Sequence, residues 1–467
     1  MRYVIFSLVV VILAHSLQAG TPVCELYVPG HFGNWYEVAG EDEMRRILIE
    51  AKTWGYNRYG DWFNTLDCVN PFSGDKQYSL GNALWDRKKV HFRTAQRLGL
   101  QTDLIITPNH VYRDQLKAER IAQTGGRVFG QLICPHKPGA REVILNNHRQ
   151  LLADLAAAGI RLTAITAAPY DYGGCNCDRC QPWILTFADL VCEIHKIAQT
   201  YHPGIELHFI GWWWSAEEHR RFTDWMDQNA PNIAQSVALH IPYDKNCVAE
   251  VPLPKNCKRH AFVHIGYAEE SEPRDVYGRT GPVIAARRLM KTVQNLKKQS
   301  VSGVVAYSEG IFDDVNKALL AGLFTDRFES SEEVIQAYAK RYFAANEVQA
   351  NQWLNWLLPW GKPFNHDASV AGRSFRGLCG EPSNWRRRQW ELKADMFVAH
   401  HAIGVGDDWT PDRLAHAEEF WDAYETLQRS VYGVGPLRHS LGPSYIGLTW
   451  YKSWTQHRHA VATQPNH

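Results

Sequence analysis

The sequence predicts an α/β fold, a (β/α)8 barrel over residues 21–330, followed by an α-helical domain over residues 331–467. Three observations lead to this prediction. Short apolar or β-branched runs that end in a polar loop recur about eight times between Cys24 and Phe328. Segments with apolar residues at helical spacing separate most of these runs, as in a parallel sheet built from strand–helix units. From Ser331 onward the strand pattern stops, and amphipathic segments rich in aromatic residues follow.

Each expected strand is a short, largely apolar run that stops at a polar or glycine-containing turn. In chain order, the expected strands lie at 25–29, 55–64, 104–107, 162–168, 205–214, 233–244, 260–270 and 301–310. An open doubly wound sheet is the alternative arrangement of such strands. Because no G-x-G-x-x-G follows the first strand and no P-loop occurs in the sequence, the nucleotide-binding versions of that sheet lose support.

The expected helices follow the same reading. The segment 41–53 has apolar residues at helical spacing and acids in its first turn, where a helix prefers them. The other barrel helices are expected at 88–98, 141–159, 182–199, 216–228, 281–299 and 310–324. The helices of the second domain are expected at 331–343, 350–358, 384–402 and 412–432. The segment 245–259 has no helical period and contains two prolines, so an irregular connection is expected there.

Carboxylates follow several of the expected strands. They are Asp61, Asp171, Asp244, Glu269, Glu270 and Glu309. Because all strands of a barrel open on one face, these side chains are expected to converge on one cleft. Two carboxyl groups there can break a glycosidic bond: one protonates the leaving oxygen, and the other supports the oxocarbenium-like centre or activates water.

Glu309 is the first catalytic candidate, as nucleophile or electrostatic stabiliser, because it follows a buried run and has no helix-start role. Asp171 is the candidate general acid/base, since it follows the run 162–168. A turn aspartate beside a Gly-Gly bend is the alternative for Asp171. The next acids along the chain, Asp313 and Asp314, are most simply explained as helix-start charges.

Aromatic residues make up 12% of the chain, and tryptophan and tyrosine present flat apolar faces that suit stacking on sugar rings. The candidate stacking platforms are Trp62, Tyr170, Tyr172, Trp213, Trp214 and Tyr307. Alternate residues of a strand point opposite ways, so at most two of the tryptophans at 212–214 can face the cleft. Asp61, Asp244 and Glu269 are expected to bind a substrate hydroxyl or to hold a loop. His110 is expected to bind a hydroxyl or carboxylate group, although a lone histidine is more often structural.

The charge balance and the first residues bear on partners and location. A formal net charge of +1 gives no electrostatic case for nucleic acid or an anionic membrane as partner. Residues 1–20 have an early arginine, an apolar run and small residues near the end, which predicts a secretory signal peptide and a secreted or periplasmic protein. No HExxH or GxSxG motif occurs, so metalloprotease and serine-hydrolase functions have no anchor, and no cofactor is expected.

The ten cysteines all follow the predicted signal peptide, and their even number makes disulfides plausible in an exported chain. Cys247 and Cys257 are the simplest local pair to propose. Cys175, Cys177 and Cys180 form C-x-C-x-x-C, which could bind a metal with a fourth ligand. A local disulfide is favoured instead, because no second CxxC or histidine pair stands at matching spacing.

Three stretches carry a resemblance to known enzymes: AKTWGYNRYGDWFN, PYDYGGCNCDRC and VVAYSEGIFDDVNKALL. Together they resemble the secreted carbohydrate-active barrels related to the hexosaminidase and α-glucuronidase groups of glycoside hydrolases. Those groups place an acid/base carboxylate after the fourth strand, a position that Asp171 matches. The hexosaminidase pattern has an adjacent Asp-Glu pair there, whereas this chain has Asp171-Tyr172, so the resemblance does not imply substrate-assisted cleavage of an N-acetyl sugar.

The resemblance also implies a second carboxylate. Many retaining barrels have it after the seventh strand, where Glu269 and Glu270 stand, whereas Glu309 follows the expected eighth strand. A miscount by one strand would exchange these assignments.

The function expected from the sequence is that of an exported glycoside hydrolase acting on a poly- or oligosaccharide. A separation of about 5 Å between the Glu309 and Asp171 carboxyls implies retention of configuration, and one of about 6.5–9.5 Å implies inversion. The alternatives are a barrel that binds glycans without cleaving them, and a metal-dependent hydrolase that uses the three-cysteine loop.

Overall fold

The structure of the protein is a computed structural model. It describes residues 22–29, 36–63, 65, 68–73, 80–123, 132–169, 174–242, 245–270, 281–308, 310–361, 375, 377–378, 384–404, 406, 408–433 and 450–462. The predicted signal peptide at 1–20 lies outside these residues, so it stays a prediction.

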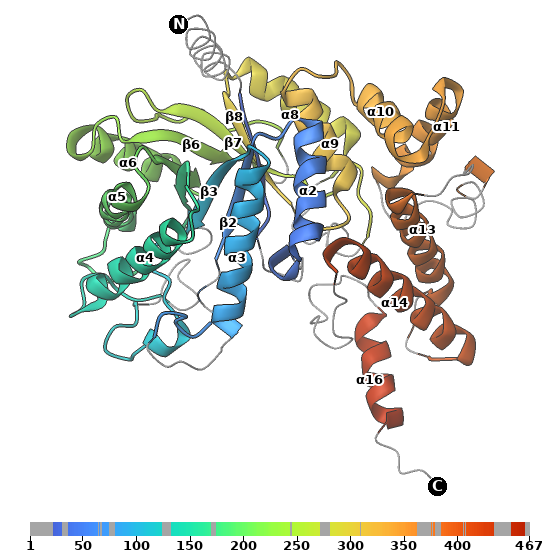
Figure 1. The fold of residues 1–467 in the computed structure, drawn as a ribbon, viewed down its shortest axis with the longest axis horizontal. Coiled ribbons are helices and arrows are strands. Elements are labelled where there is room, and N and C mark those ends of the chain that lie inside the picture. Colours follow the sequence, from blue (N-terminus) through green and yellow to red (C-terminus); the bar gives the residue numbers. More distant parts are fainter. Residues whose placement is uncertain are drawn as a thin grey trace, which may run out of the picture.

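Eight parallel strands close into a barrel in chain order, which confirms the predicted (β/α)8 fold (Figure 1). The strands are β1 (Val23–Tyr27), β2 (Arg58–Trp62), β3 (Gln101–Ile106), β4 (Ala164–Ala167), β5 (Glu206–Gly211), β6 (Ala234–His240), β7 (Lys258–His264) and β8 (Gly303–Tyr307). The ring closes where β1 pairs with β8, with Tyr27 opposite Tyr307. Each observed strand overlaps one of the eight expected runs, so the strand count made from the sequence is right.

Helices connect the strands and cover the outside of the barrel (Figure 1). They are α2 (Glu41–Trp54), α3 (Leu80–Arg97), α4 (Ala140–Ala157), α5 (Trp183–Tyr201), α6 (Ala216–Asn229), α8 (Ala286–Lys298) and α9 (Asp314–Phe324). Between β6 and β7 the described residues contain no helix, as the prolines of 245–259 predict. Short 3-10 helices stand at Tyr36–Val38 and Arg113–Gln115.

A helical region follows the barrel, as predicted. It comprises α10 (Ser331–Phe343), α11 (Glu347–Leu357), a 3-10 helix at Leu358–Gly361, α13 (Trp385–Ile403), α14 (Pro411–Tyr432) and α16 (Tyr451–Ala462). Figure 1 shows it on one side of the barrel, where α10 packs against α9 and α14 against α2. The last of these helices, α16, is not among the helices expected from the sequence. The domain boundary at residue 331 stays a prediction.

Alternate side chains of each barrel strand point to opposite faces of the sheet, so the strands contribute to two separate apolar clusters. Outward side chains such as Leu26 and Phe209 join the large core between strands and helices. Inward side chains form a separate cluster inside the ring. It consists of Tyr27, Trp62, Ile105, Ala168, Ile210, Trp212, Ala238, Phe262, Val305 and Tyr307. Its largest members stand at the carboxyl ends of their strands, so the inside of the barrel becomes aromatic toward that end.

The amino-terminal end of the barrel interior is polar instead. The Arg58 guanidinium donates to Glu206 at 3.0 Å and lies 3.0 Å from His208 Nε2. His208 Nδ1 lies 2.7 Å from the Ser236 hydroxyl. At Gly303 a Cβ atom would stand 2.6 Å from the His260 ring, so this strand position requires glycine. These contacts close the end of the barrel opposite to the one where chemistry is expected.

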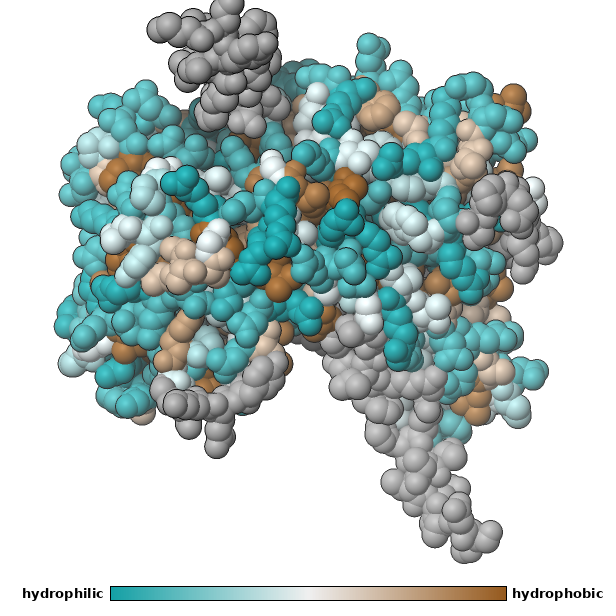
Figure 2. All heavy atoms as spheres, in the orientation of Figure 1, coloured by the Kyte–Doolittle hydropathy of each residue, from teal (hydrophilic) through white to brown (hydrophobic). Residues whose placement is uncertain are grey.

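The face of the molecule drawn in Figure 2 carries mostly hydrophilic residues. Figure 2 shows that on the face in view apolar residues appear as small scattered spots among polar ones. Among the described helices, none combines the length and the apolar character that a membrane crossing requires.

Candidate functional site

Five adjacent strands end in an arc of aromatic and imidazole rings around the mouth of the barrel. The ring of Trp212, directly after β5, lies 4.2 Å from that of His240 and 5.1 Å from that of His264. His264 lies 5.1 Å from Tyr307, and Tyr307 lies 5.5 Å from Tyr27. We call these five residues the aromatic arc. Because its members end β6, β7, β8 and β1 and follow β5, the arc spans more than half of the mouth.

Trp213 adds a solvent-exposed ring to the buried arc. Its ring lies 4.7 Å from His240, and 44% of the residue is exposed. Its φ of +55° lies in the left-handed region, which is uncommon for a tryptophan and turns the chain out of the strand direction after Trp212. An exposed aromatic face beside a buried aromatic floor is a suitable surface for stacking a sugar ring.

Trp62 and His110 stand near the remaining part of the mouth. Trp62 ends β2 with its side chain in the inner cluster, and its ring lies 6.3 Å from that of His110. Both residues are buried. Burial lowers the pKa of His110 to about 3, so its imidazole is neutral at physiological pH. The sequence placed Trp62, His110, Trp213 and Tyr307 near one cleft, and the structure brings all four to the mouth.

Trp214 does not lie at the mouth with its two neighbours. Its ring packs 4.9 Å from Phe222 and 6.0 Å from Phe187, and the residue is only 8% exposed. It therefore belongs to the core between the strands and α5 and α6. Trp212 takes the place that the sequence analysis assigned to Trp214. Counting in steps of two along β5 from His208 reaches both Trp212 and Trp214, but the left-handed φ of +55° at Trp213 breaks the alternation, so only Trp212 faces inward.

Asp61 lies in the barrel wall, on the opposite face of β2 from Trp62. Its carboxylate accepts hydrogen bonds from Lys88 Nζ at 2.6 Å and from the Tyr59 hydroxyl at 2.5 Å. Burial alone would raise the pKa of Asp61, but the Lys88 ammonium and His91 outweigh it and hold the pKa below its ordinary value. The contacts of Asp61 are therefore those of a buried ion pair between β2 and α3.

We expect Asp61→Asn to lower the free energy of unfolding by about 3–5 kcal/mol, because Lys88, only 2% exposed, then keeps a buried charge without a counterion. Urea unfolding at pH 7 measures this loss. The double variant Asp61→Asn/Lys88→Met is the control, and it should recover most of the stability since both charges are gone. A single variant with full stability and weakened saccharide binding would instead assign Asp61 to the substrate.

Glu269 caps a helix. Its two carboxylate oxygens accept from the backbone N–H groups of Arg287 at 2.9 Å and Arg288 at 2.8 Å, at the start of α8. Arg288 in turn donates to the carbonyl oxygens of His264, at 3.1 Å, and Tyr267, at 2.8 Å. Glu269 thus holds a loop, which is one of the two roles expected for it, and Arg288 fixes the chain that leaves β7.

The chain after β8 is fixed by a buried polar network. The Ser308 hydroxyl donates to Asp313 at 3.0 Å and lies 2.6 Å from the Tyr36 hydroxyl. Lys317 Nζ pairs with Asp313 at 2.6 Å and donates to the carbonyl oxygen of Gly310 at 2.9 Å. Gly310 has a φ of +127°, a conformation that side chains disfavour. The residues on both sides of position 309 are therefore held in place.

Several of the predicted site residues lie outside the described residues. They are Glu309, Asp171, Tyr170, Tyr172 and Asp244. The strands that lead to the first two are described: β4 precedes Asp171, and β8 precedes Glu309. The fourth and eighth strands of a closed eight-strand ring stand across from each other. Because Glu309 follows the eighth strand of the ring and Asp171 follows the fourth, the strand miscount that would have exchanged the carboxylate assignments is excluded.

The cysteines of the C-x-C-x-x-C loop meet a fourth cysteine. The Sγ atoms of Cys134, Cys175, Cys177 and Cys180 all lie within 4.8 Å of one another. The described cysteines are free thiols, including the pair Cys247 and Cys257. The local disulfide favoured for this loop is absent from the structure, because the Sγ atoms do not stand at the S–S bonding distance of about 2.05 Å.

Comparison with family models and with curated protein sequences finds no match. Solved structures are similar in fold. A GH138 enzyme targeting pectin rhamnogalacturonan II is 8% identical, covers 92% of this chain and 67% of its own, and gives a TM-score of 0.50. GH5_18 from Streptomyces cattleya, in complex with GlcNAc, is 13% identical over 67% of this chain and 82% of its own, with a TM-score of 0.43. The catalytic domain of β-amylase from Paenibacillus polymyxa is 10% identical over 66% and 98%, with a TM-score of 0.42. The similarity to the GH138 enzyme shows a shared fold.

Proposed function

We propose that the protein is an exported glycoside hydrolase that cleaves a glycosidic bond in a poly- or oligosaccharide. The observation that carries this proposal is the aromatic arc at the carboxyl-terminal mouth of a closed (β/α)8 barrel, where such enzymes hold their substrates. The fold shared with the GH138 enzyme supports the same class. The charged and then apolar segment at 1–20 supports export.

In this proposal Glu309 and Asp171 are the two catalytic carboxylates. They follow strands on opposite sides of the mouth, which suits a pair that must act on a bond from two directions. Asp171 protonates the leaving oxygen as general acid/base, and Glu309 acts as nucleophile or electrostatic stabiliser. The network of Ser308, Asp313 and Lys317 supports Glu309 by fixing the chain next to it.

The sugar rings bind over the aromatic arc and Trp213. Their apolar faces stack on Trp213 and Tyr307, while the hydroxyl groups reach imidazole and carboxylate groups such as His110 and Asp244. Trp62, Tyr170 and Tyr172 complete the proposed binding surface. The structure adds Trp212, His240 and His264 at the ends of β5, β6 and β7, where the Trp212 ring lies 4.2 Å from that of His240 and 5.1 Å from that of His264.

Incubation with a panel of polysaccharides tests the proposal. We expect at least one neutral, N-acetylated or pectic polymer to yield new reducing ends, at a rate that heat-denatured protein does not reproduce. Pectic oligosaccharides belong in the first panel because of the fold shared with the GH138 enzyme. Measurable oligosaccharide binding with no reducing ends after days would reveal a glycan-binding barrel without catalysis. A protein that neither binds nor cleaves any member of the panel would refute a carbohydrate function.

A further inference from the structure

We infer that Cys134, Cys175, Cys177 and Cys180 bind a structural zinc ion. We call these residues the four-cysteine cluster. In the part of the chain that the structure describes, no other group of three or more histidine, cysteine or acidic side chains is placed to hold a metal. The assignment rests on geometry and ligand chemistry and does not depend on the proposed glycosidase activity.

The spacing of the sulfur atoms fits tetrahedral coordination. Four thiolates at about 2.3 Å from a zinc ion stand about 3.8 Å from one another. Cys134 Sγ lies 3.8 Å from Cys177 Sγ and 3.5 Å from Cys180 Sγ, and all four sulfur atoms lie within 4.8 Å of one another. Disulfide-bonded pairs would be much closer and would join the sulfur atoms two by two, whereas Cys134 has two similarly distant partners.

Backbone contacts around the four-cysteine cluster suit metal binding. Cys177 and Cys180 are separated by two residues, a spacing typical of zinc sites, and Cys180 N–H donates to the carbonyl oxygen of Cys177 at 2.9 Å. The backbone N–H of Gln123 donates to Cys175 Sγ at 3.2 Å, the kind of outer contact that stabilises a metal-bound thiolate. Cys134, far away in sequence, is brought in because its neighbour Ile133 forms an antiparallel bridge with Ile121.

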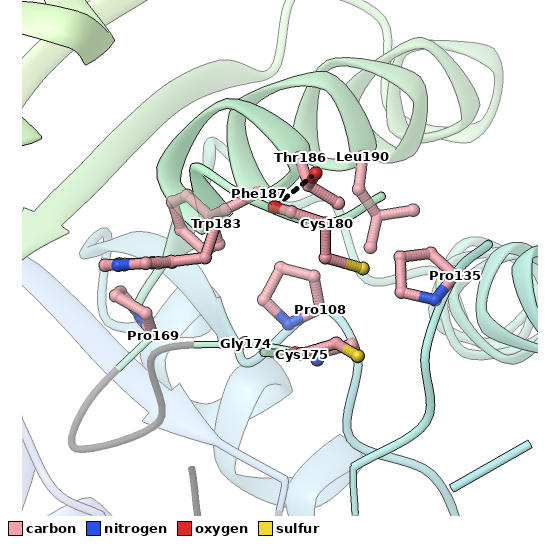
Figure 3. A pocket seen from close by; sticks show the side chains of 11 residues that line it. Pro108, Pro135, Pro169, Gly174, Cys175, Cys180, Trp183, Thr186, Phe187 and Leu190 are labelled. Carbon is pink, nitrogen blue, oxygen red and sulfur yellow. Dashed lines mark hydrogen bonds between the residues drawn. The ribbon is translucent and has the colours of Figure 1, made fainter. Parts of the chain in front are cut away.

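Three of the four cysteine side chains are buried, and a bound metal ion accounts for so many thiols gathered in one buried place. Cys134, Cys175 and Cys180 are at most 2% exposed and form a small cluster of their own with Ala122 and Leu132, separate from the main core. Figure 3 shows the Cys175 and Cys180 side chains along a cavity of about 20 Å³, with both sulfur atoms toward the side where Pro135, the neighbour of Cys134, lies. Four thiols gathered from two loops are a typical structural metal site, and soft thiolate ligands select zinc among the common divalent ions.

The ligand count predicts a structural role. Because four protein thiolates fill the tetrahedral positions of zinc, no position stays open for a water nucleophile. A hydrolase mechanism centred on this loop, one of the alternatives raised by the sequence, therefore has little support. The ion would instead join the segment after β3 to the loop after β4. Under the proposed function this loop matters because Asp171 lies only a few residues before Cys175.

Metal analysis of the full-length protein, purified without chelators, tests the inference. We expect about one zinc ion per chain, and X-ray absorption should show four sulfur neighbours at about 2.3 Å. Cys134→Ser should lose most of the zinc, whereas the control Cys247→Ser, on the loop between β6 and β7, should keep it.

Wild-type measurements keep the inference testable if Cys134→Ser fails to fold. The assignment would be overturned if the wild-type protein contained no zinc or held iron in its place. It would also be overturned by nitrogen or oxygen ligands on the ion, or by disulfides among these cysteines in mass spectrometry. Protein that holds zinc on four sulfurs yet cleaves no glycan would leave the zinc site intact and refute only the glycosidase proposal.

Discussion

Glu309→Gln is expected to lower kcat on the polysaccharide that the wild type cleaves by about 10³-fold or more. Glutamine keeps the shape of the side chain but can neither attack the anomeric carbon nor stabilise a positive charge on it. Initial rates of reducing-end release measure the effect. The thermal unfolding midpoint should stay near that of the wild type, since the contacts that hold the neighbouring chain come from Ser308, Asp313 and Lys317.

A matched control and a rescue separate the possible roles of Glu309. Glu347→Gln makes the same change on an α11 side chain that is 85% exposed, and its activity should match the wild type. If Glu309 is the nucleophile of a retaining enzyme, azide should restore turnover to Glu309→Ala and form a glycosyl azide. Undiminished kcat in Glu309→Gln would remove this residue from catalysis and leave Asp171 and Glu270 as candidates.

The barrel itself could be predicted from the sequence because its signal is local. The run expected at 301–310 contains β8, and the one expected at 162–168 contains β4, so the residues that follow both strands were placed correctly along the chain. The sequence predicts less reliably which face of a strand each side chain occupies. Asp61 and Trp62 are the last two residues of β2, and their side chains point to opposite sides. Only the register of the strand decides which of them enters the barrel.

The missed features depend on contacts between distant segments. The fourth ligand of the four-cysteine cluster, Cys134, precedes the other three by some forty positions, and no spacing rule connects them. Asp314 looked like a helix-start charge from the sequence, and it does begin α9. Its strongest partner, Lys393, belongs to a helix in the C-terminal region, a contact that only the folded chain reveals.

Asp314→Asn is expected to lower the free energy of unfolding by about 3–5 kcal/mol at pH 7. The Asp314 carboxylate is 5% exposed and lies 2.6 Å from Lys393 Nζ and 3.2 Å from the Arg386 guanidinium, both on α13. The Tyr338 hydroxyl of α10 donates to it as well. The substitution therefore leaves two cations without their counterion in the buried junction between the barrel and the helices that follow it.

The cost of Asp314→Asn should depend on pH. Burial alone would raise the pKa of Asp314, but Lys393 and Arg386 outweigh it and hold the pKa well below its ordinary value. A carboxylate with a lowered pKa stabilises the folded state fully above the ordinary value of about 4, and this contribution disappears as the pH falls toward the folded pKa. The difference between wild type and variant in urea unfolding should therefore be largest at neutral pH and shrink below pH of about 4.

Two further variants show whether the loss arises from the buried charges. Burial lowers the pKa of Lys393 to about 8, so this ammonium is still mostly protonated at pH 7 and needs Asp314. Asp314→Asn/Lys393→Met should therefore recover part of the stability, with Arg386 still unpaired. Asp326→Asn, at a surface ion pair with 79% of the aspartate exposed, should cost less than about 1 kcal/mol. Equal losses in Asp314→Asn and Asp326→Asn would mean that this junction does not depend on its buried ion pair, and that ring packing such as Trp54 on Tyr338 holds the barrel and the C-terminal helices together.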